Sequence, residues 1–462
     1  MISSTAVSGS IAAKPALPGT DRTALAHIPG DDGFPLVGDT FRFIANPLGY
    51  AEEMARQYGL VHRTRVFGLR SVSLLGPDGL GFVLFDQSKL FSSMEGWNPF
   101  LSLLFPRGLM LRDFDEHRLH RRAMSTAFKA GALKSYLAAL NSGISARLAQ
   151  WRQGPRNFLF YPAIKQLTLD LAATSFLGEA LGTEVAAIKR AFIDMVAASV
   201  AVIRTPLPLT PMRRGVVGRQ RIIEYFSGQA PRRRERGGED IFSQLCRATY
   251  DDGSLMTVAD IADHMSFLMM AAHDTLTSSL SAFVYFLTSH PEWQEKLRAE
   301  VRGLRLAPGE PLPFERLDEL RLTEMAFKEA MRLIPPVISL PRRAMREFEF
   351  AGYRFPASTR VNTSIVFTHH MAEIWPEPRR FDPTRFSEDN SRGRHRFAYA
   401  PFGGGAHMCL GLHFAYMQAK CFAYHFLSTT KVSSAPGYRP KWQMTPIPKP
   451  RDGLRVRLEL AG

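Results

Sequence analysis

The longest helical pattern in the chain runs from about Thr257 to Ser289 and ends just before Pro291. At 1.5 Å per residue such a helix spans about 50 Å, enough to cross a whole domain. Helical patterns dominate some two hundred residues around it, whereas residues 60–76 and 348–367 predict short strands joined by turns. We therefore predict a mainly α fold with a minor β region.

Composition supports one large soluble domain. The chain has 462 residues, is 45% hydrophobic and contains 33 phenylalanines, which is ample for a sizeable core. Residues 1–28 predict a disordered tail rich in serine and alanine, and residues 29–462 predict a single domain. Proline-rich residues 205–211 and the basic loop predicted at 231–240 would separate helices.

The net charge of +15 raises the possibility of nucleic-acid binding. The arginines are spread along the chain and accompany no nucleic-acid motif, so we predict no nucleic-acid partner and favour an acidic protein partner. No segment reaches the roughly 18 apolar residues that a membrane span needs. The three cysteines show no disulfide framework. These features together predict a cytoplasmic protein without a transmembrane segment.

One cysteine stands in an unusual setting, the segment FGGGAHMCLG at residues 402–411. Three successive glycines allow another group to approach the backbone closely. Cys409 precedes an apolar, helix-like run, and a helix start favours thiolate over thiol. We predict that this segment presents one sulfur anion to a flat or bulky partner, the alternative being an inert core cysteine.

Two further constellations combine charge with helical spacing. Thr275 lies four residues after Ala271, so its hydroxyl can bond to that carbonyl, and Asp274 follows an apolar run where a charge is costly. The alternative is a buried helix with structural polar groups. Glu329 and Arg332 share a helix face, with Arg385 as a plausible third member. If exposed, Glu329 and Arg332 form a weak surface ion pair. If buried with Arg385, the three residues form a network that stabilises the core.

Taken in order, FGGGAHMCLG, AAHDTLT, Glu329-x-x-Arg332, FDPTRF and HRLHR resemble the motifs of the cytochrome P450 superfamily, the haem-thiolate monooxygenases. The resemblance covers nearly the whole chain. It implies haem b held by an axial cysteine thiolate, which would be Cys409, the metal ligand. It also implies dioxygen as a co-substrate and electrons from NAD(P)H through partner proteins.

The resemblance assigns further residues to the haem site. His117 and Arg121 match haem-propionate contacts, as does Arg342, with Arg343 as a one-residue alternative. His407 stands where most members carry arginine. The remaining residues assigned to cofactor binding are Ala271, Phe402, Gly403 and Gly411.

Asp274 and Thr275 match the family's acid–alcohol pair, in which the hydroxyl holds dioxygen and the acid relays protons. Glu329, Arg332 and Arg385 match a structural triad that serves folding and haem retention. The acid–alcohol pair favours hydroxylation over the alternatives, a haem-thiolate isomerase or dehydratase, or a ligand-binding haemoprotein without oxygen turnover.

The resemblance also predicts an apolar substrate pocket, typical of a lipophilic small molecule such as a steroid, terpenoid, retinoid or fatty acid. Rigid isoprenoid-like molecules are favoured because no charged residue stands out as a carboxylate clamp. The chain shows no fused reductase, so electrons are expected from a ferredoxin or flavodoxin with its reductase. Basic residues for docking it would include Arg118, Arg122, Arg392, Arg394 and Arg396. The predicted pocket residues are Trp97, Phe100, Phe267, Met270, Ala271, Val337, Ile338, Leu340 and Met444.

Overall fold

The computed structural model describes residues 24–154, 157–178, 183–199, 201 and 204–460. Most of the predicted tail, residues 1–23, lies outside the described residues. Leu25 and Ile28 are each 1% exposed and pack beneath the largest sheet. The folded domain therefore begins before residue 29, the predicted boundary between tail and domain. Leu25 and Ile28 belong to it because their apolar side chains complete the core under that sheet.

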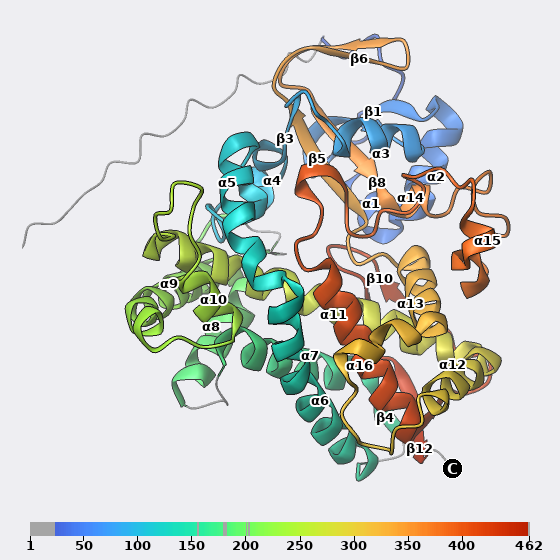
Figure 1. Ribbon diagram of the computed structural model, residues 1–462. Coiled ribbons are helices and arrows are strands. Elements are labelled where there is room, and N and C mark those ends of the chain that lie inside the picture. The colour runs from blue at the N-terminus through green and yellow to red at the C-terminus, as the bar shows by residue number, and fades with distance from the viewer. Residues whose placement is uncertain (1–23, 155–156, 179–182, 200, 202–203, 461–462) are drawn as a thin grey trace, which may run out of the picture.

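Helices make up most of the described chain (Figure 1). In the first half they are α1 (Thr40–Ala45), α2 (Pro47–Tyr58), α3 (Gly76–Leu84), α4 (Ser93–Leu101), α5 (Phe114–Ser125), α6 (Ala130–Arg152), α7 (Phe160–Leu177), α8 (Thr183–Ser199) and α9 (Pro211–Arg236). In the second half they are α10 (Ile241–Cys246), α11 (Val258–Ser289), α12 (Pro291–Gly303), α13 (Arg321–Leu333), α14 (Ile365–Thr368), α15 (Glu388–Ser391) and α16 (Leu412–Thr429). The short 3₁₀ helices include η1 (Leu109–Leu111), η4 (Pro383–Phe386) and η5 (Gly405–His407).

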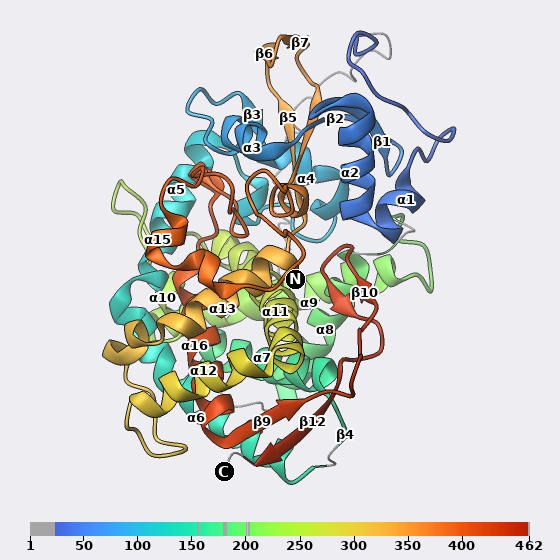
Figure 2. The same ribbon diagram turned by 90° about the vertical axis from the view of Figure 1, so that its right-hand side faces the viewer.

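The predicted long helix is confirmed as α11, and it forms the centre of the molecule (Figures 1 and 2). The Thr257 side chain accepts a hydrogen bond from the Asp260 amide and caps its start. Helices α7, α9 and α13 pack against it. Because neighbours surround it, α11 is apolar around much of its circumference, as expected of a buried helix.

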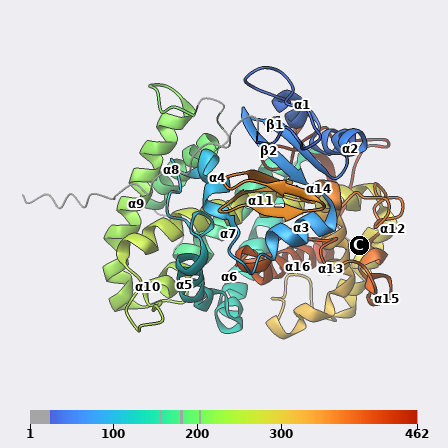
Figure 3. The same ribbon diagram turned by 90° about the horizontal axis from the view of Figure 1, so that it is seen from above.

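The strands form a five-stranded sheet and smaller pieces. The large sheet has the order β1-β2-β8-β5-β3 and lies over the helical body, above α11 (Figures 1 and 3). The short strands predicted within residues 60–76 are β1 and β2, which form an antiparallel hairpin, and β2 pairs in parallel with β8. The strands are β1 (Val61–Val66), β2 (Leu69–Leu74), β3 (Phe91–Ser92), β4 (Asn157–Leu159), β5 (Ser339–Ala344), β6 (Phe348–Phe350), β7 (Tyr353–Phe355), β8 (Arg360–Ser364), β9 (Thr430–Ser433), β10 (Trp442–Gln443), β11 (Lys449–Pro450) and β12 (Arg455–Leu460).

One loop prediction is wrong. Residues 231–236 continue α9 instead of forming a basic loop, and the helix ends at Gly237, whose φ is +72°. Arg233 donates to the carbonyl of Leu177, and Arg234 donates to that of Cys246. These tertiary contacts hold the last turns of α9 and outweigh the single backbone hydrogen bond that Pro231 removes.

Candidate haem and oxygen site

The glycines before Cys409 shape a tight segment between β5, α3 and α16. Gly403 and Gly405 have φ of +70° and +61°, which favours glycine. Side chains at Gly404 and Gly405 would collide with Phe85 and with the carbonyl of Leu84 at the end of α3. The sequence predicted that the glycines admit a flat partner, but at these two positions they admit α3 instead.

Cys409 is held by backbone contacts at the end of this segment. Its amide donates to the Phe402 carbonyl at 2.9 Å. The side chain retains accessible surface, although protein surrounds it. Burial raises the pKa of the thiol, while the Gly411 amide and Arg121 act in the opposite direction. The helix-start effect predicted from the sequence is thus present but outweighed by burial, and a bound metal ion would remove the proton.

The other two cysteines, Cys246 and Cys421, are packed into the core. Cys421 lies 3.5 Å from the Asn141 side-chain oxygen and is fully buried. Burial raises the pKa of Cys246 to about 12. Of the three cysteines, Cys409 is the one whose sulfur can reach a ligand without displacing core side chains.

Four nitrogen-bearing side chains gather beside the Cys409 segment. The rings of His117 and His407 lie 3.9 Å apart, and the charges of Arg121 and Arg342 act on both. Burial, followed by these two arginines, lowers the pKa of His117 to about 4. The nearby carboxylate is Asp113, 3.9 Å from the His407 ring. This basic cluster fits an anionic ligand with two carboxylates, as haem has in its propionates.

Arg342 is the strongest sign of such a ligand. It is 5% exposed, and the hydrogen bond found for its guanidinium goes to the Pro341 carbonyl at 2.9 Å. Burial lowers its pKa to about 10 and outweighs the opposite effect of the Asp113 carboxylate, so its charge is only partly compensated. Arg343, the alternative, contacts Glu95 at 3.4 Å and donates to the Ser358 carbonyl. The structure therefore brings Arg342, and not Arg343, to the basic cluster.

The predicted acid and alcohol, Asp274 and Thr275, are consecutive residues of α11, but their side chains contact different groups. The Thr275 hydroxyl donates to the Ala271 carbonyl at 2.7 Å, as the spacing predicted. One Asp274 oxygen lies 3.1 Å from the His273 ring and 3.3 Å from the Lys165 ammonium group. Burial raises the pKa of Asp274, but these two partners outweigh it and lower the pKa below its usual value.

Sequence reasoning missed the two partners of Asp274. His273 precedes it directly, so its proximity could have been noticed. Lys165 comes from α7, and no local sequence signal connects that helix with α11. The Lys165 side chain is 38% exposed and that of Asp274 is 14% exposed. The pair therefore links the buried carboxylate to the solvent side of α11.

The predicted pocket residues come from the two hydrophobic cores of the molecule. Phe267, Met270 and Ala271 belong to or pack on the helical core, while Leu340 belongs to the core under the large sheet and Val337 packs on it. Trp97 of α4 packs on both cores, and Phe100 and Met444 pack on the helical one. Ile338 is 5% exposed. The predicted pocket residues are thus divided between the two cores, and Trp97 contacts both.

The predicted triad is in contact. The Glu329 carboxylate lies 2.7 Å and 2.8 Å from two nitrogens of Arg332, and both side chains are fully buried. Arg385 approaches Glu329 at 3.4 Å. Arg332 also donates to the carbonyls of His369 and Pro378. The network therefore ties α13 to the segment that contains η4.

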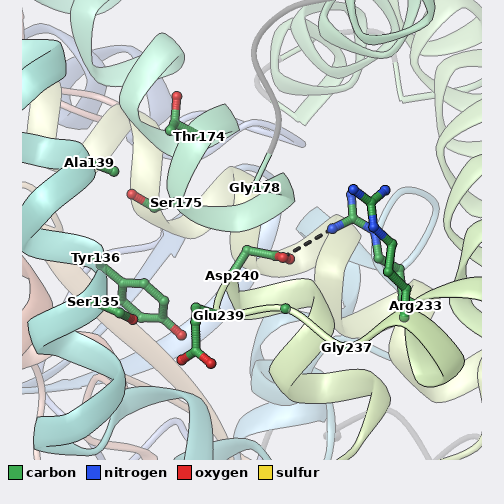
Figure 4. Close-up of a pocket in the computed structure, with 12 residues that line it drawn as sticks. Ser135, Tyr136, Ala139, Thr174, Ser175, Gly178, Arg233, Gly237, Glu239 and Asp240 are labelled. Carbon is green, nitrogen blue, oxygen red and sulfur yellow. Dashed lines mark hydrogen bonds and ion pairs between the residues drawn. The ribbon is translucent and has the colours of Figure 1, made fainter.

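A separate hollow of about 320 Å³ lies where α6, α7, α9 and α10 meet (Figure 4). None of its lining residues belongs to the Cys409 segment, the basic cluster or the predicted pocket. Asp240 accepts from the Ser243 amide and lies 3.0 Å from Arg233, which in turn donates to the Leu177 carbonyl. These polar groups bind the ends of helices, so the hollow has no evident chemical role.

The Cys409 segment and the basic cluster beside it, unlike the triad and the hollow, have the features of a ligand site, and they indicate the class of protein. An accessible cysteine beside the buried Arg342 and the half-buried Arg121 suits an iron porphyrin, whose metal accepts a thiolate and whose propionates accept cations. A long central helix with an acid–alcohol pair belongs to the same arrangement. The fold and the site together define a haem-thiolate protein.

Comparison with known proteins agrees with this class. Residues 28–456 match the family described as Cytochrome P450, and the chain belongs to that family. Putative cytochrome P450 136 of Mycobacterium tuberculosis is 37% identical over 446 residues, which cover 94% of this chain and 89% of the relative. Putative cytochrome P450 120 of Synechocystis sp. is 30% identical, covering 95% of this chain and 98% of the relative.

Human cytochrome P450 26B1 is also 30% identical, over 95% of this chain and 88% of its own. Among solved structures, retinoic acid-bound cyanobacterial CYP120A1 is similar, with a TM-score of 0.85 and 29% identity over 94% of this chain and 99% of that one. The chain is accordingly a monooxygenase that takes haem with an axial cysteine thiolate, dioxygen and electrons from redox partners. Among the described residues, no helix combines the length and apolar character that crossing a bilayer requires.

Proposed function

We propose that Cys409 is the axial ligand of the haem and that the enzyme hydroxylates a lipophilic small molecule. The observation that carries this proposal is the accessible Cys409 sulfur beside a basic cluster in which Asp113 is the one carboxylate found among the described residues. His117, Arg121, Arg342 and His407 would hold the propionates. The haem, when bound, supplies the iron chemistry that reduces and cleaves dioxygen.

The residues of α11 would control protons near the reacting atoms. Thr275 now donates to the Ala271 carbonyl, and turning its hydroxyl by one rotamer would free that donor for dioxygen. Asp274 is held ionised by His273 and Lys165 and reaches toward solvent through Lys165. A carboxylate in this position can accept a proton from the solvent side and pass it to Thr275.

A substitution at Cys409 tests the ligand. In Cys409→Ser we expect loss of the absorbance that the reduced, carbon monoxide-treated wild type shows for thiolate ligation. Cys421→Ser is the matched control, because it also removes one sulfur and leaves the Cys409 segment unchanged. Retention of that absorbance in Cys409→Ser, or its loss in Cys421→Ser, would refute the assignment.

The alternative function is a haem-thiolate isomerase or dehydratase, or a haemoprotein that binds ligands without consuming dioxygen. The presence of Asp274 and Thr275 on α11 favours oxygen turnover over these alternatives. With a surrogate redox system and isotopically labelled dioxygen, we expect one labelled atom in the product. Product formed without label would support the alternative.

For the substrate we propose a rigid isoprenoid-like molecule, with retinoids as the first class to test. The predicted pocket is apolar, and a solved relative is described as retinoic acid-bound. Another relative, from Taxus cuspidata, is named taxane 10-beta-hydroxylase and is 29% identical. A panel of steroids, terpenoids, retinoids and fatty acids, followed by the spin-state shift, tests the choice. A response confined to fatty acids would overturn it.

The proposed electron donor is an acidic ferredoxin or flavodoxin, reduced by a separate reductase. The side chains of Arg118 and Arg122 on α5 and of Arg392 after α15 are 72%, 65% and 75% exposed, and each is paired with an aspartate. Arg394 is less suited than predicted, because it stacks on Trp375 at 4.3 Å and is partly buried. Docking through these cations predicts that added salt slows reduction by an acidic carrier. A salt-independent rate would contradict it.

We further propose that the predicted domain, residues 29–462, together with the packed residues from Leu25 onward, forms one haem domain and that it works in the cytoplasm. The two hydrophobic cores share Trp97, which supports a single folding unit. All three cysteines are free, which suits a reducing compartment. A single cooperative unfolding transition and recovery in the cytosolic fraction are the expected results. Two separate transitions would contradict the single domain.

A further inference from the structure

His273 is a buried histidine of α11 whose two ring nitrogens both face proton-accepting groups. It is 2% exposed and lies where α7 packs against α11 (Figure 2). Its ring is 5.9 Å from that of Phe192 on α8. Besides its neighbour Asp274, the titratable groups found here among the described residues are Lys165 and Tyr161 of α7. These groups together determine how many protons the ring carries.

One ring nitrogen of His273, Nε2, carries a hydrogen because of the group that it faces. It lies 3.1 Å from the backbone carbonyl of Lys165. A carbonyl oxygen accepts hydrogen bonds and cannot donate one, so Nε2 is the donor. In a neutral imidazole the other nitrogen, Nδ1, would then have a lone pair and no hydrogen.

The surroundings of Nδ1 do not suit a lone pair. Nδ1 lies 3.1 Å from a carboxylate oxygen of Asp274, and neither atom makes an aligned hydrogen bond with another described group. A lone pair that faces a carboxylate oxygen at this distance is repelled, whereas a proton between the two atoms makes them an ion pair. The geometry therefore favours one proton more than a neutral histidine and an ionised aspartate carry together.

The electrostatics of Asp274 place this extra proton on the imidazole and not on the carboxylate. Burial raises the pKa of Asp274, but the contacts with His273 and Lys165 outweigh it and bring the pKa below its usual value. The Lys165 ammonium group lies 3.3 Å from the same carboxylate oxygen, and its side chain is 38% exposed. The Tyr161 phenol stays neutral, because burial raises its pKa to about 12. Asp274 is thus an anion with a buried cation on one side and a solvated one on the other.

We propose that His273 is a positioning residue that holds, on Nδ1, the proton that Asp274 passes to Thr275. In this step the Nδ1–H bond breaks and an O–H bond forms on Asp274, which leaves a neutral imidazole that still donates through Nε2. After Asp274 has released the proton, Lys165 returns one through Asp274 to Nδ1, and water reprotonates Lys165. Each step moves one proton and no electron. The role in delivery rests on the proposed function of Asp274 and Thr275, whereas the proton on Nδ1 rests on the geometry alone.

Nitrogen NMR of the haem-loaded protein with isotope-labelled histidine tests where the proton lies, in the diamagnetic reduced form with carbon monoxide. At pH 7 we expect N–H signals from both ring nitrogens of His273, identified as the signals lost in His273→Gln. In Asp274→Asn the Nδ1–H signal should disappear, because an amide can donate to the bare nitrogen.

A second buried histidine, His370, is the internal reference for that experiment. Its Nδ1 lies 2.8 Å from the Val366 carbonyl and not from a carboxylate, and burial lowers its pKa to about 4. It should therefore show one N–H signal at pH 7. A single N–H signal from His273 in the wild type would overturn the proposal, as would two in Asp274→Asn.

Dioxygen consumption with a surrogate redox system tests whether the proton is used, because it needs protons whatever the substrate. His273→Gln keeps a donor for the Lys165 carbonyl and removes the titratable nitrogen beside Asp274. We expect consumption to slow roughly tenfold at pH 8 and less at pH 6.5, where water supplies protons more readily, while the haem absorbance is unchanged. The wild-type rate should vary less over this range.

His290→Gln is the matched control at the end of the same helix. Its ring contacts the Phe286 carbonyl at 3.0 Å, and the variant should follow the wild-type pH profile. The same profile in His273→Gln would overturn the role in delivery. Failure of the proposed function is distinguishable, since it appears as product without labelled oxygen, whereas a single N–H signal from His273 contradicts this inference alone.

Discussion

Two buried charged clusters, one around Glu329 and one around Arg342, are built in opposite ways. At Glu329 the carboxylate meets Arg332 in two short contacts, and Arg385 and backbone carbonyls complete the network. At Arg342 the cations and imidazoles of the basic cluster face one another, with a single nearby carboxylate at Asp113. The first cluster is satisfied by the protein itself, whereas the second has one carboxylate for two arginines and can accept an anion from outside.

This difference distinguishes a structural network from a binding site. Burying a charge costs free energy unless a partner compensates it. A chain that retains a partly compensated arginine in its interior gives up stability that a ligand can restore. Opposite responses to substitution are therefore expected at the two clusters.

The largest effect is expected at the structural cluster. Glu329→Gln would leave the buried Arg332 without its anion, and we expect the free energy of unfolding to fall by roughly 3–5 kcal/mol. Urea denaturation measures this loss. The control Glu377→Gln removes an exposed pair with Arg380 and should cost less than about 1 kcal/mol. Similar decreases in the free energy of unfolding in Glu329→Gln and Glu377→Gln would show that the buried ion pair stabilises the fold no more than the exposed one.

A smaller effect, dependent on pH, is expected next to the same cluster at His370. Burial lowers the pKa of His370 to about 4, even though its ring bonds to the Val366 carbonyl. Between pH 6.5 and 4 the unfolded chain binds more protons than the folded one, so stability falls as the pH falls. The total loss is about 3 kcal/mol.

In His370→Asn that part of the acid sensitivity should disappear, because asparagine does not titrate and can still donate to the Val366 carbonyl. Denaturation curves at several pH values between 4 and 7 measure it. A variant that loses stability with acid as steeply as the wild type would show that His370 titrates normally in the folded state.

The smallest effect, and the one opposite in sign, is expected at the basic cluster. Arg342→Met removes a cation whose burial outweighs its attraction to Asp113, so the haem-free protein should gain roughly 1–3 kcal/mol of stability. The same variant should bind haem roughly tenfold more weakly, because a propionate loses its partner. Haem titration and denaturation of the haem-free protein measure the two changes.

Arg343→Met is the matched control for that experiment. Arg343 is the adjacent residue and is compensated by Glu95 and the Ser358 carbonyl, so its loss should lower stability by about 1 kcal/mol and leave haem affinity unchanged. If the two variants exchanged these behaviours, Arg343 would be the residue that faces the haem.

Much of the site could be predicted because its residues lie in short local patterns. The spacing of Ala271 and Thr275 predicts their hydrogen bond, and that of Glu329 and Arg332 predicts a shared helix face. The partners of Asp274 could not be predicted so readily, since Lys165 lies more than one hundred residues earlier on α7. The last turns of α9 were mispredicted because contacts with α7 and α10 override the local preference of Pro231.

The sequence by itself determined the long central helix, the hairpin, the cysteine segment and the family, because periodicity and motif spacing are local properties. Only the tertiary structure decided that Arg342, and not Arg343, joins His117, that Gly404 and Gly405 press on α3, and that burial outweighs the helix start at Cys409. Each of these outcomes depends on which groups from distant segments surround a side chain. Those neighbouring groups determine how far a side chain is desolvated and which charges pair with it. The spacing of residues along the chain does not specify those neighbours.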